Sequence, residues 1–171
     1  MKKVFSIFVV AIIALPFIFS SCAEEDPAQP LVVDKTKSGT LSVNILAVIN
    51  TTTTPTVYAA APITLDNVVA WVNNNELNSS ASGRYLVPRS DMTWNNGVLT
   101  INAPTTESGV TLNVNILPAL GTRTEGTPAA PVPGIWSISS NFTGAIYPGN
   151  TTVLSFRTMN FTADKIVGSN P

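Results

Sequence analysis

The chain has few residues that could carry out acid–base or metal chemistry. It contains no histidine and a single cysteine, Cys22. Histidine is the commonest general base near neutral pH and the commonest ligand of transition metals, so serine triads and most zinc or copper sites lack their usual components. We therefore expect a protein that is not an enzyme and that holds no metal or cofactor.

Carboxylates are the remaining groups that could support catalysis. A glycosidase needs two of them across one cleft, and a calcium loop needs several oxygen ligands at close spacing. Beyond residue 26 the acids stand apart from one another in the sequence: Asp34, Asp66, Glu76, Asp91, Glu107, Glu125 and Asp164. We expect these acids to be solvated loop charges, and a carbohydrate-active enzyme that uses two of them remains an alternative.

Two tryptophans stand beside polar residues that could bind a sugar. Trp94 precedes Asn95 and is close to Asp91, and Trp71 precedes a run of asparagines at 73–75. A ring face can stack on the C–H groups of a sugar while amides and carboxylates bind its hydroxyls. Trp94, Trp71, Asn95 and Asp91 are therefore the candidate ligand-binding residues. For Trp94 we favour the alternative of an aromatic that packs on a cross-strand neighbour in a hairpin.

The N-terminal segment has the layout of an export signal. Two lysines follow Met1, residues 4–19 carry no charge, and two serines stand before Cys22. This order of charged start, apolar stretch and small residues is typical of a cleaved signal peptide. The alternative is a transmembrane helix, but a span normally needs about 20 apolar residues. We predict removal of residues 1–21, which would leave Cys22 at the new N-terminus.

Two short patterns around Cys22 carry a family resemblance. The letters FSSC at 19–22 resemble the lipobox of bacterial lipoproteins, although Phe19 stands where leucine is common. The resemblance implies that Cys22 is acylated and anchors the mature protein to a membrane. The acids at 24–26 resemble the export signal of Bacteroidota surface lipoproteins, and this implies an outer-membrane location facing the cell exterior. A solvated acidic linker is the alternative for 24–26. The resemblance ends near residue 26, and it assigns the mature domain to no known family.

The rest of the chain reads as short strands. Apolar residues alternate with polar ones over 41–45, with Ala47 and Ile49 on the same face, and most clearly over 110–116, as in strands with one buried face. Asn96-Gly97 predicts a hairpin turn, since both residues tolerate positive φ. The stretch 66–77 is ambiguous, and we favour a strand over a one-turn helix because of its β-branched residues. The other predicted strands cover 56–60 with 63–65, 85–87, 92–94, 98–103, 135–139 and 152–159.

The spacing of these strands predicts the fold. Short strands with turns at roughly ten-residue spacing are typical of a sandwich or barrel. We predict an immunoglobulin-like β-sandwich of about seven to nine strands in residues 39–171, after the signal peptide (1–21) and a lipidated, proline-containing tether (22–38). The Pro- and Gly-rich segment 118–134 is predicted to be a long loop, and 161–171 a polar tail. The sequence lacks the Cys…Trp…Cys spacing of true immunoglobulin domains.

Charge and composition narrow the function. The formal net charge is −1 and the arginines are scattered, so we expect no nucleic-acid partner. We expect a non-catalytic surface lipoprotein that is held by its lipid anchor and binds a glycan or a peptide. The alternative is a structural subunit or accessory of a surface assembly, either pilus-like or a nutrient-uptake complex. An exposed row of aromatics would favour binding, whereas an unpaired sheet edge would favour assembly.

Overall fold

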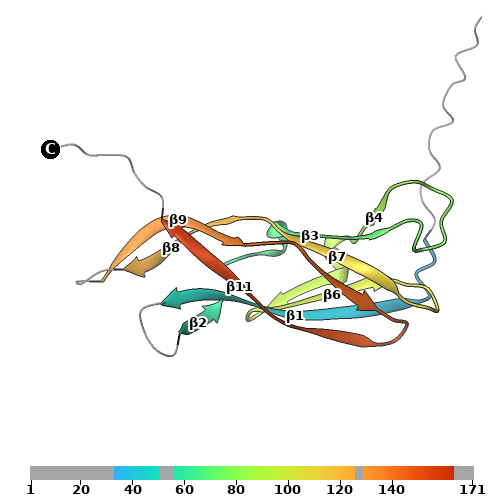
Figure 1. Cartoon of the computed structure of the whole chain (residues 1–171), viewed down its shortest axis with the longest axis horizontal. Coiled ribbons are helices and arrows are strands. Elements are labelled where there is room, and N and C mark those ends of the chain that lie inside the picture. The colour runs from blue at the N-terminus through green and yellow to red at the C-terminus, as the bar shows by residue number, and fades with distance from the viewer. Residues whose placement is uncertain (1–32, 51–55, 126–128, 164–171) are drawn as a thin grey trace, which may run out of the picture. The chain divides into compact units, whose positions relative to one another are not determined.

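The computed structural model describes residues 33–50, 56–125 and 129–163 (Figure 1). The predicted signal peptide, Cys22 and most of the predicted tether lie outside these residues. Within the described residues, no helix has the length and apolar content needed to cross a bilayer.

The described chain forms two β-sheets, which confirms the predicted all-β sandwich. The larger sheet has the strand order β5 (Met92–Asn95), β6 (Val98–Pro104), β1 (Ser38–Asn50), β11 (Thr151–Ala163), β9 (Ala130–Ile138) and β8 (Ala119–Glu125), with β2 (Val57–Ala60) also paired to β1. The smaller sheet has the order β10 (Phe142–Ile146), β7 (Val110–Ile116), β3 (Val68–Asn73) and β4 (Arg84–Leu86). These strands exceed the predicted seven to nine because several predicted loops and ends are themselves strands.

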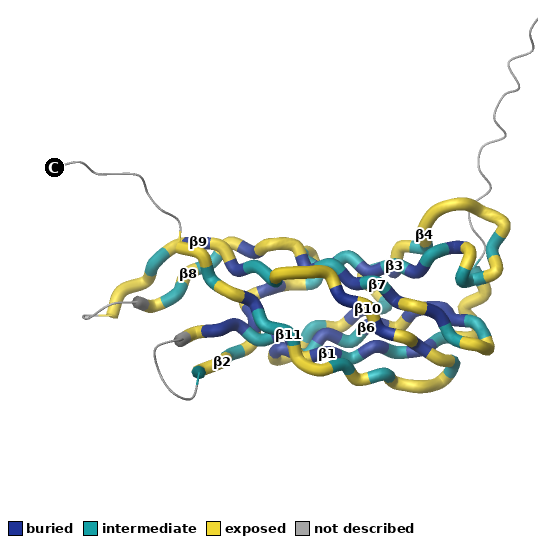
Figure 2. Tube along the Cα trace, viewed as in Figure 1, coloured by how far each residue is buried: buried dark blue, intermediate teal, exposed yellow. Residues whose placement is uncertain are grey.

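Alternating apolar residues of both sheets form the core. In β7 every second residue from Val110 to Ile116 is buried, and in β1 the same is true from Leu41 to Ala47. Burying one such valine, leucine or isoleucine contributes about 1.5–3 kcal/mol. Figure 2 shows the resulting alternation of buried and exposed positions along the strands. Trp136 belongs to the same core, with 4% of its surface exposed.

The hairpin that joins β5 to β6 confirms the turn prediction. Asn95 pairs with Val98, which leaves Asn96 and Gly97 as a two-residue loop. Their φ angles are +45° and +86°, the left-handed values that a tight hairpin turn requires. The twist of this turn matches that of the flanking strands, so it sets the register of the β5–β6 pair.

The prediction of a long loop over 118–134 is wrong. Strands β8 and β9 pair over this segment, from Ala119 opposite Trp136 to Glu125 opposite Ala130. Pro131 and Pro133 point their backbone nitrogens to the same edge of β9, and β11 pairs with β9 only from Gly134 onward. A proline is tolerated in a strand whose edge has no partner at that position, so both can lie in the hairpin.

Strand β10 was not predicted. It extends the β8–β9 hairpin, because it pairs with β7, the strand that precedes β8. β10 pairs with β7 from Phe142 opposite Val114 to Ile146 opposite Val110. The chain therefore runs as one interrupted hairpin in which β7 and β10 belong to the smaller sheet and β8 and β9 to the larger. Figure 1 shows β8 and β9 at the opposite end of the sandwich from β4. The hairpin links the two sheets covalently.

Three shorter predictions need correction. Residues 63–65 do not extend β2; instead a one-turn 3-10 helix, Leu65–Asn67, begins there and is capped by the side chain of Thr64. In the ambiguous stretch 66–77 the strand prediction is right for 68–73, and residues 74–78 form a turn. Strand β11 continues to Ala163, so the predicted polar tail begins later than 161. A second 3-10 helix spans Arg89–Asp91.

Strand β11 has an unusual pairing. It runs parallel to β1 from Thr151 to Met159 and then antiparallel to β9 from Met159 to Ala163. In the described pairings, residues 151–158 have a partner on the β1 side alone. The register with β1 shifts between Val43 and Ile45, which places a bulge in β11 just before Arg157.

Candidate functional site

A cavity of about 470 Å³ opens on the outer face of the smaller sheet, and we call it the Trp71 cavity. Trp71 of β3 and Thr143 of β10 both pair with Asn113 of β7, so the three side chains form one row across three strands. Their neighbours along each strand point into the core, which turns this row outward. The strand register thus brings together side chains that are far apart in the sequence.

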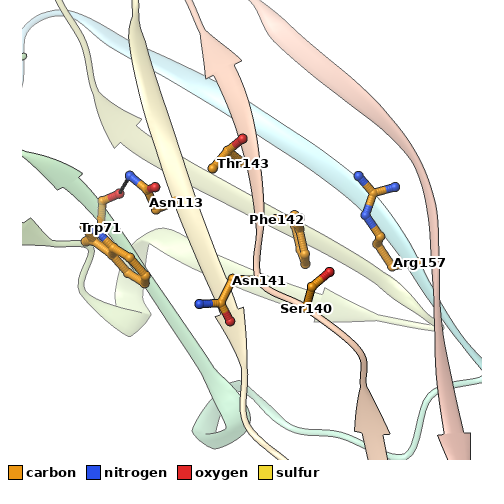
Figure 3. Close-up of a pocket in the computed structure, with 7 residues that line it drawn as sticks. All are labelled: Trp71, Asn113, Ser140, Asn141, Phe142, Thr143 and Arg157. Atoms are coloured by element: carbon orange, nitrogen blue, oxygen red, sulfur yellow. Dashed lines mark hydrogen bonds between the residues drawn. The ribbon is translucent and has the colours of Figure 1, made fainter.

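The opposite wall comes from the segment that connects β9 to β10, from the start of β10 and from β11. It consists of Ser140, Asn141, Phe142 and Arg157. In Figure 3, Trp71 and Arg157 lie at opposite ends of this group, with Asn141 and Phe142 between them. The cavity therefore has an aromatic ring at one end, a guanidinium at the other, and amides and hydroxyls in between.

Local contacts hold the two end groups. The guanidinium of Arg84 lies 4.7 Å from the centroid of the Trp71 ring. The side-chain amide of Asn113 donates to the carbonyl oxygen of Trp71 at 3.4 Å (Figure 3). At the other end, the guanidinium of Arg157 lies 5.4 Å from the ring centroid of Phe142.

The main chain fixes Arg157 further. Its Nη1 donates to the carbonyl oxygens of Ser155 and Phe156, at 3.1 and 3.3 Å. Both acceptors lie at the bulge of β11, so the bulge helps to direct this side chain. Arg157 is half-buried, and it is the charged residue of a strand that is otherwise neutral.

Two cations near the cavity stand outside the ion pairs of the described chain. The ion pairs among the described residues are Lys35–Asp91 at 3.9 Å, Lys37–Glu107 at 2.7 Å, and Arg89–Asp66. Arg84 and Arg157 take part in none of them. Two guanidinium groups without a carboxylate partner among the described residues therefore flank the Trp71 cavity.

The predicted ligand-binding residues do not form one site. Trp94 lies directly opposite Leu99 and packs half-buried against the core. Asn95 is exposed at the hairpin, and Asp91 pairs with Lys35. These three belong to the larger sheet or its border, whereas Trp71 is in the smaller sheet. Of the four, Trp71 alone lines the cavity.

The other cavity residues, Asn113, Ser140, Asn141, Phe142, Thr143 and Arg157, are not among those that the sequence indicates. One signal was available for Arg157, since it is the charged residue in an otherwise neutral run from 151 to 163. The side chains of Asn113 and Thr143 carry no such signal, because polar residues on an outer strand face are common.

The described acids have local structural partners. Asp34 accepts from the backbone and hydroxyl of Thr36, at 2.9 and 2.6 Å, and Glu76 accepts from the backbone N–H of Thr111 at 3.1 Å. Asp66, Asp91 and Glu107 are held in the ion pairs above. The side chain of Glu125 and all of Asp164 lie outside the described residues. No group of three metal-binding side chains occurs in the described part of the chain.

A second cavity, of about 310 Å³, is lined by Asp34, Lys37 and Glu107 together with neighbouring loop residues. The hydrogen bonds from Thr36 lower the pKa of Asp34. The hydrogen bond and the charge of Glu107 raise the pKa of Lys37. The charged groups of this cavity are therefore already satisfied by one another and by the local turn.

No protein-family model matches the chain. No curated protein matches it in sequence. Among solved structures, GBS52, the minor pilin of the Gram-positive pathogen Streptococcus agalactiae, is similar with a TM-score of 0.36 and 11% sequence identity. The similarity covers 78% of this chain and 48% of the pilin, so the chain spans about half of that protein's length. The score is too low to transfer a function from the pilin.

Proposed function

We propose that this protein is a non-catalytic surface lipoprotein whose β-sandwich binds a glycan in the Trp71 cavity. The observation that carries the proposal is the assembly of Trp71 with Asn113, Asn141 and Thr143 in one concave surface. Three separate strands and a connecting segment supply these groups, so the arrangement depends on the folded sandwich.

The chemistry of the cavity suits a sugar. Each sugar ring has an apolar C–H face and a rim of hydroxyls, which need an aromatic surface and hydrogen-bonding side chains. Neighbouring strands lie about 4.8 Å apart, so the distance from β3 to β10 across β7 is roughly 10 Å. A ligand that reaches from Trp71 to Thr143 must therefore be longer than one sugar ring.

The remaining parts of the proposal rest on the sequence and on the placement of the acids. Acylated Cys22 would hold the domain at the outer membrane, facing the cell exterior. A glycosidase would need two carboxylates about 5–9.5 Å apart in a cleft. None of the described acids is among the residues that line the Trp71 cavity, and this placement supports a binding role.

A glycan array tests the proposal. The full-length protein, solubilised in detergent, is compared with Trp71→Ala and with Tyr58→Ala. Tyr58 is a matched control, since it is an aromatic with 44% of its surface exposed on β2 of the other sheet. We expect the wild type and Tyr58→Ala to bind the same glycans and Trp71→Ala to lose at least tenfold in affinity, about 1.4 kcal/mol. A wild type that binds no glycan, or a Trp71→Ala variant that binds equally well, would refute it.

One observation favours the second candidate, a subunit of a surface assembly. The N–H of Thr40 donates to the carbonyl of Asn150 at 2.9 Å, so the backbone groups of Asn150 face β1. Successive residues of a strand direct their backbone groups to opposite edges, and those of Thr151 and Val153 therefore face the open edge of β11. An open edge can add a strand from another chain. The bulge before Arg157 interrupts this edge, and bulges of this kind block unwanted pairing. The edge therefore supports assembly less well than the cavity supports binding.

Light scattering at rising protein concentration tests the assembly function. Val153→Pro leaves the hydrogen bonds to β1 in place but blocks an added strand at the open edge. We expect self-association of the wild type that Val153→Pro abolishes if the edge builds an assembly. A wild type that is monomeric throughout would count against self-assembly through this edge.

A further inference from the structure

We infer that the ligand of the Trp71 cavity is an acidic glycan, with a sugar carboxylate bound by Arg157. The inference rests on the proposed function and adds the chemical class of the ligand. The acidic character of the ligand is inferred from the charge and contacts of Arg157. Binding of a neutral glycan would not require this arginine.

Arg157 is half-buried, and its guanidinium has no carboxylate partner among the described residues. Among the described residues its guanidinium contacts the Phe142 ring, and its Nη1 donates to two main-chain carbonyls. A guanidinium carries five N–H donors in a planar fork, so donors remain beyond these contacts. A partly desolvated charge without a partner is unfavourable, and a carboxylate that binds in a bidentate manner would satisfy it.

The rest of the charge distribution agrees with an anionic ligand. The three cations Lys35, Lys37 and Arg89 are paired with acids away from the cavity. Arg84 stacks on Trp71 and adds a second guanidinium at the opposite end. The acid Glu76 contacts β7 at Thr111, two residues before Asn113. Its Oε1 accepts a hydrogen bond from the N–H of Thr111. The net surroundings of the cavity are therefore positive, although the formal charge of the chain is −1.

The position of the cation decides between a glycan and an acidic peptide. Arg157 lies at one end of the cavity and the indole of Trp71 at the other, with Asn141 between them (Figure 3). A uronic or sialic acid residue in an oligosaccharide places a carboxylate on one ring and an apolar face on a neighbouring ring. A peptide of glutamates alone would satisfy Arg157 but offers no ring face to stack on Trp71. The observations therefore favour the glycan.

Calorimetric titration of the full-length protein in detergent tests this inference. The probes are oligosaccharides that contain galacturonate, glucuronate or sialate, each with its methyl ester, in which the ring is kept and the charge is lost. The proteins are the wild type, Arg157→Gln, Arg157→Lys and Trp71→Ala. A thermal melt of each variant shows that it is folded.

We expect the wild type to bind one acidic glycan at least about tenfold more tightly than its ester. Arg157→Gln should bring the affinity for the acid close to that for the ester, Arg157→Lys should keep part of the preference, and Trp71→Ala should weaken both ligands. Added salt should reduce the preference in the wild type.

The outcomes separate the two proposals. Equal binding of acid and ester by the wild type, or binding of neutral glycans alone, would overturn the acidic ligand and leave glycan binding intact. A preference that survives in Arg157→Gln would overturn the role of Arg157. Binding of a glutamate hexapeptide but of no glycan would overturn both, as would the absence of any glycan binding.

Discussion

Thr105 offers a quantitative test of how the two sheets are joined. It follows the last residue of β6 and is 5% exposed, and its Oγ1 donates to the carbonyl of Ile146 at 3.1 Å. Its N–H donates to the carbonyl of Lys37 at 2.9 Å, so one residue connects the larger sheet to the end of β10. Thr105→Val keeps the shape of the side chain and removes the hydroxyl donor. Depriving a buried carbonyl of its donor costs about 1–3 kcal/mol.

The matched variant Thr105→Ser separates the hydroxyl from the methyl group. Serine keeps the donor and loses one buried methyl, which costs about 0.8 kcal/mol. Urea unfolding is the measurement, and with an m-value of about 2 kcal/mol/M a loss of 2 kcal/mol lowers the midpoint by about 1 M. We expect the valine variant to be the less stable of the two. If it unfolds at the wild-type urea concentration, or if serine is the more damaging change, the hydroxyl does not hold the sheets together.

Three further predictions concern the turn, the core and the ion pair. Gly97→Ala should cost about 1–2 kcal/mol in urea unfolding, because an L residue must adopt the φ of +86°; a neutral result would contradict the tight-turn assignment. Leu112→Ala, at a position with no exposed surface, should cost about 2–5 kcal/mol by the same measurement, and a cost below 1 kcal/mol would show that the site is not core. The raised pKa of Lys37 should return toward its ordinary value in Glu107→Gln, as followed by NMR titration; since the pKa is raised in the fold, its contribution to stability is present at lower pH and is lost as the pH rises through that pKa. An unchanged Lys37 pKa would exclude Glu107 as its cause.

Local patterns predicted those parts of the fold in which one strand face is buried. β7 begins and ends at the predicted residues because four buried side chains alternate with three polar ones. The β5–β6 hairpin was predicted correctly because Asn96 and Gly97 favour a single type of turn. In these segments the local preference and the tertiary packing agree.

The errors arose where tertiary pairing overrides composition. β8 and β9 contain prolines and glycines that favour a loop. They form strands because they pair with each other at the edge of the larger sheet, where β9 also pairs with β11 from Gly134 onward. β10 was missed because Gly144, the centre of the strand, resembles a turn residue. Leu41 packs against this glycine from the facing sheet, where a side chain at 144 would collide with it. The need for glycine there comes from packing between sheets, which the sequence of β10 alone cannot show.

The Trp71 cavity could be predicted only in part for the same reason. A tryptophan beside asparagines is a local signal, and it identified Trp71. The pairing of Trp71 and Thr143 with Asn113 depends on strand order, which a single sequence does not reveal. Arg157 reaches the cavity from the other sheet, by way of a bulge that no local pattern predicts.

The parallel pairing of β1 with β11 determines how the domain responds to a pulling force. Because the two strands run in the same direction, the chain enters this pair at Ser38 and leaves β11 at Ala163, at opposite ends of the strands (Figure 1). Tension applied between the N-terminal and the C-terminal side of the domain would slide β1 lengthwise along β11. The pairing of residues 40–47 of β1 with β11 would then resist the force as a whole, because all its hydrogen bonds are loaded in shear at once. An antiparallel pair with both pulled ends on one side would instead open one bond at a time.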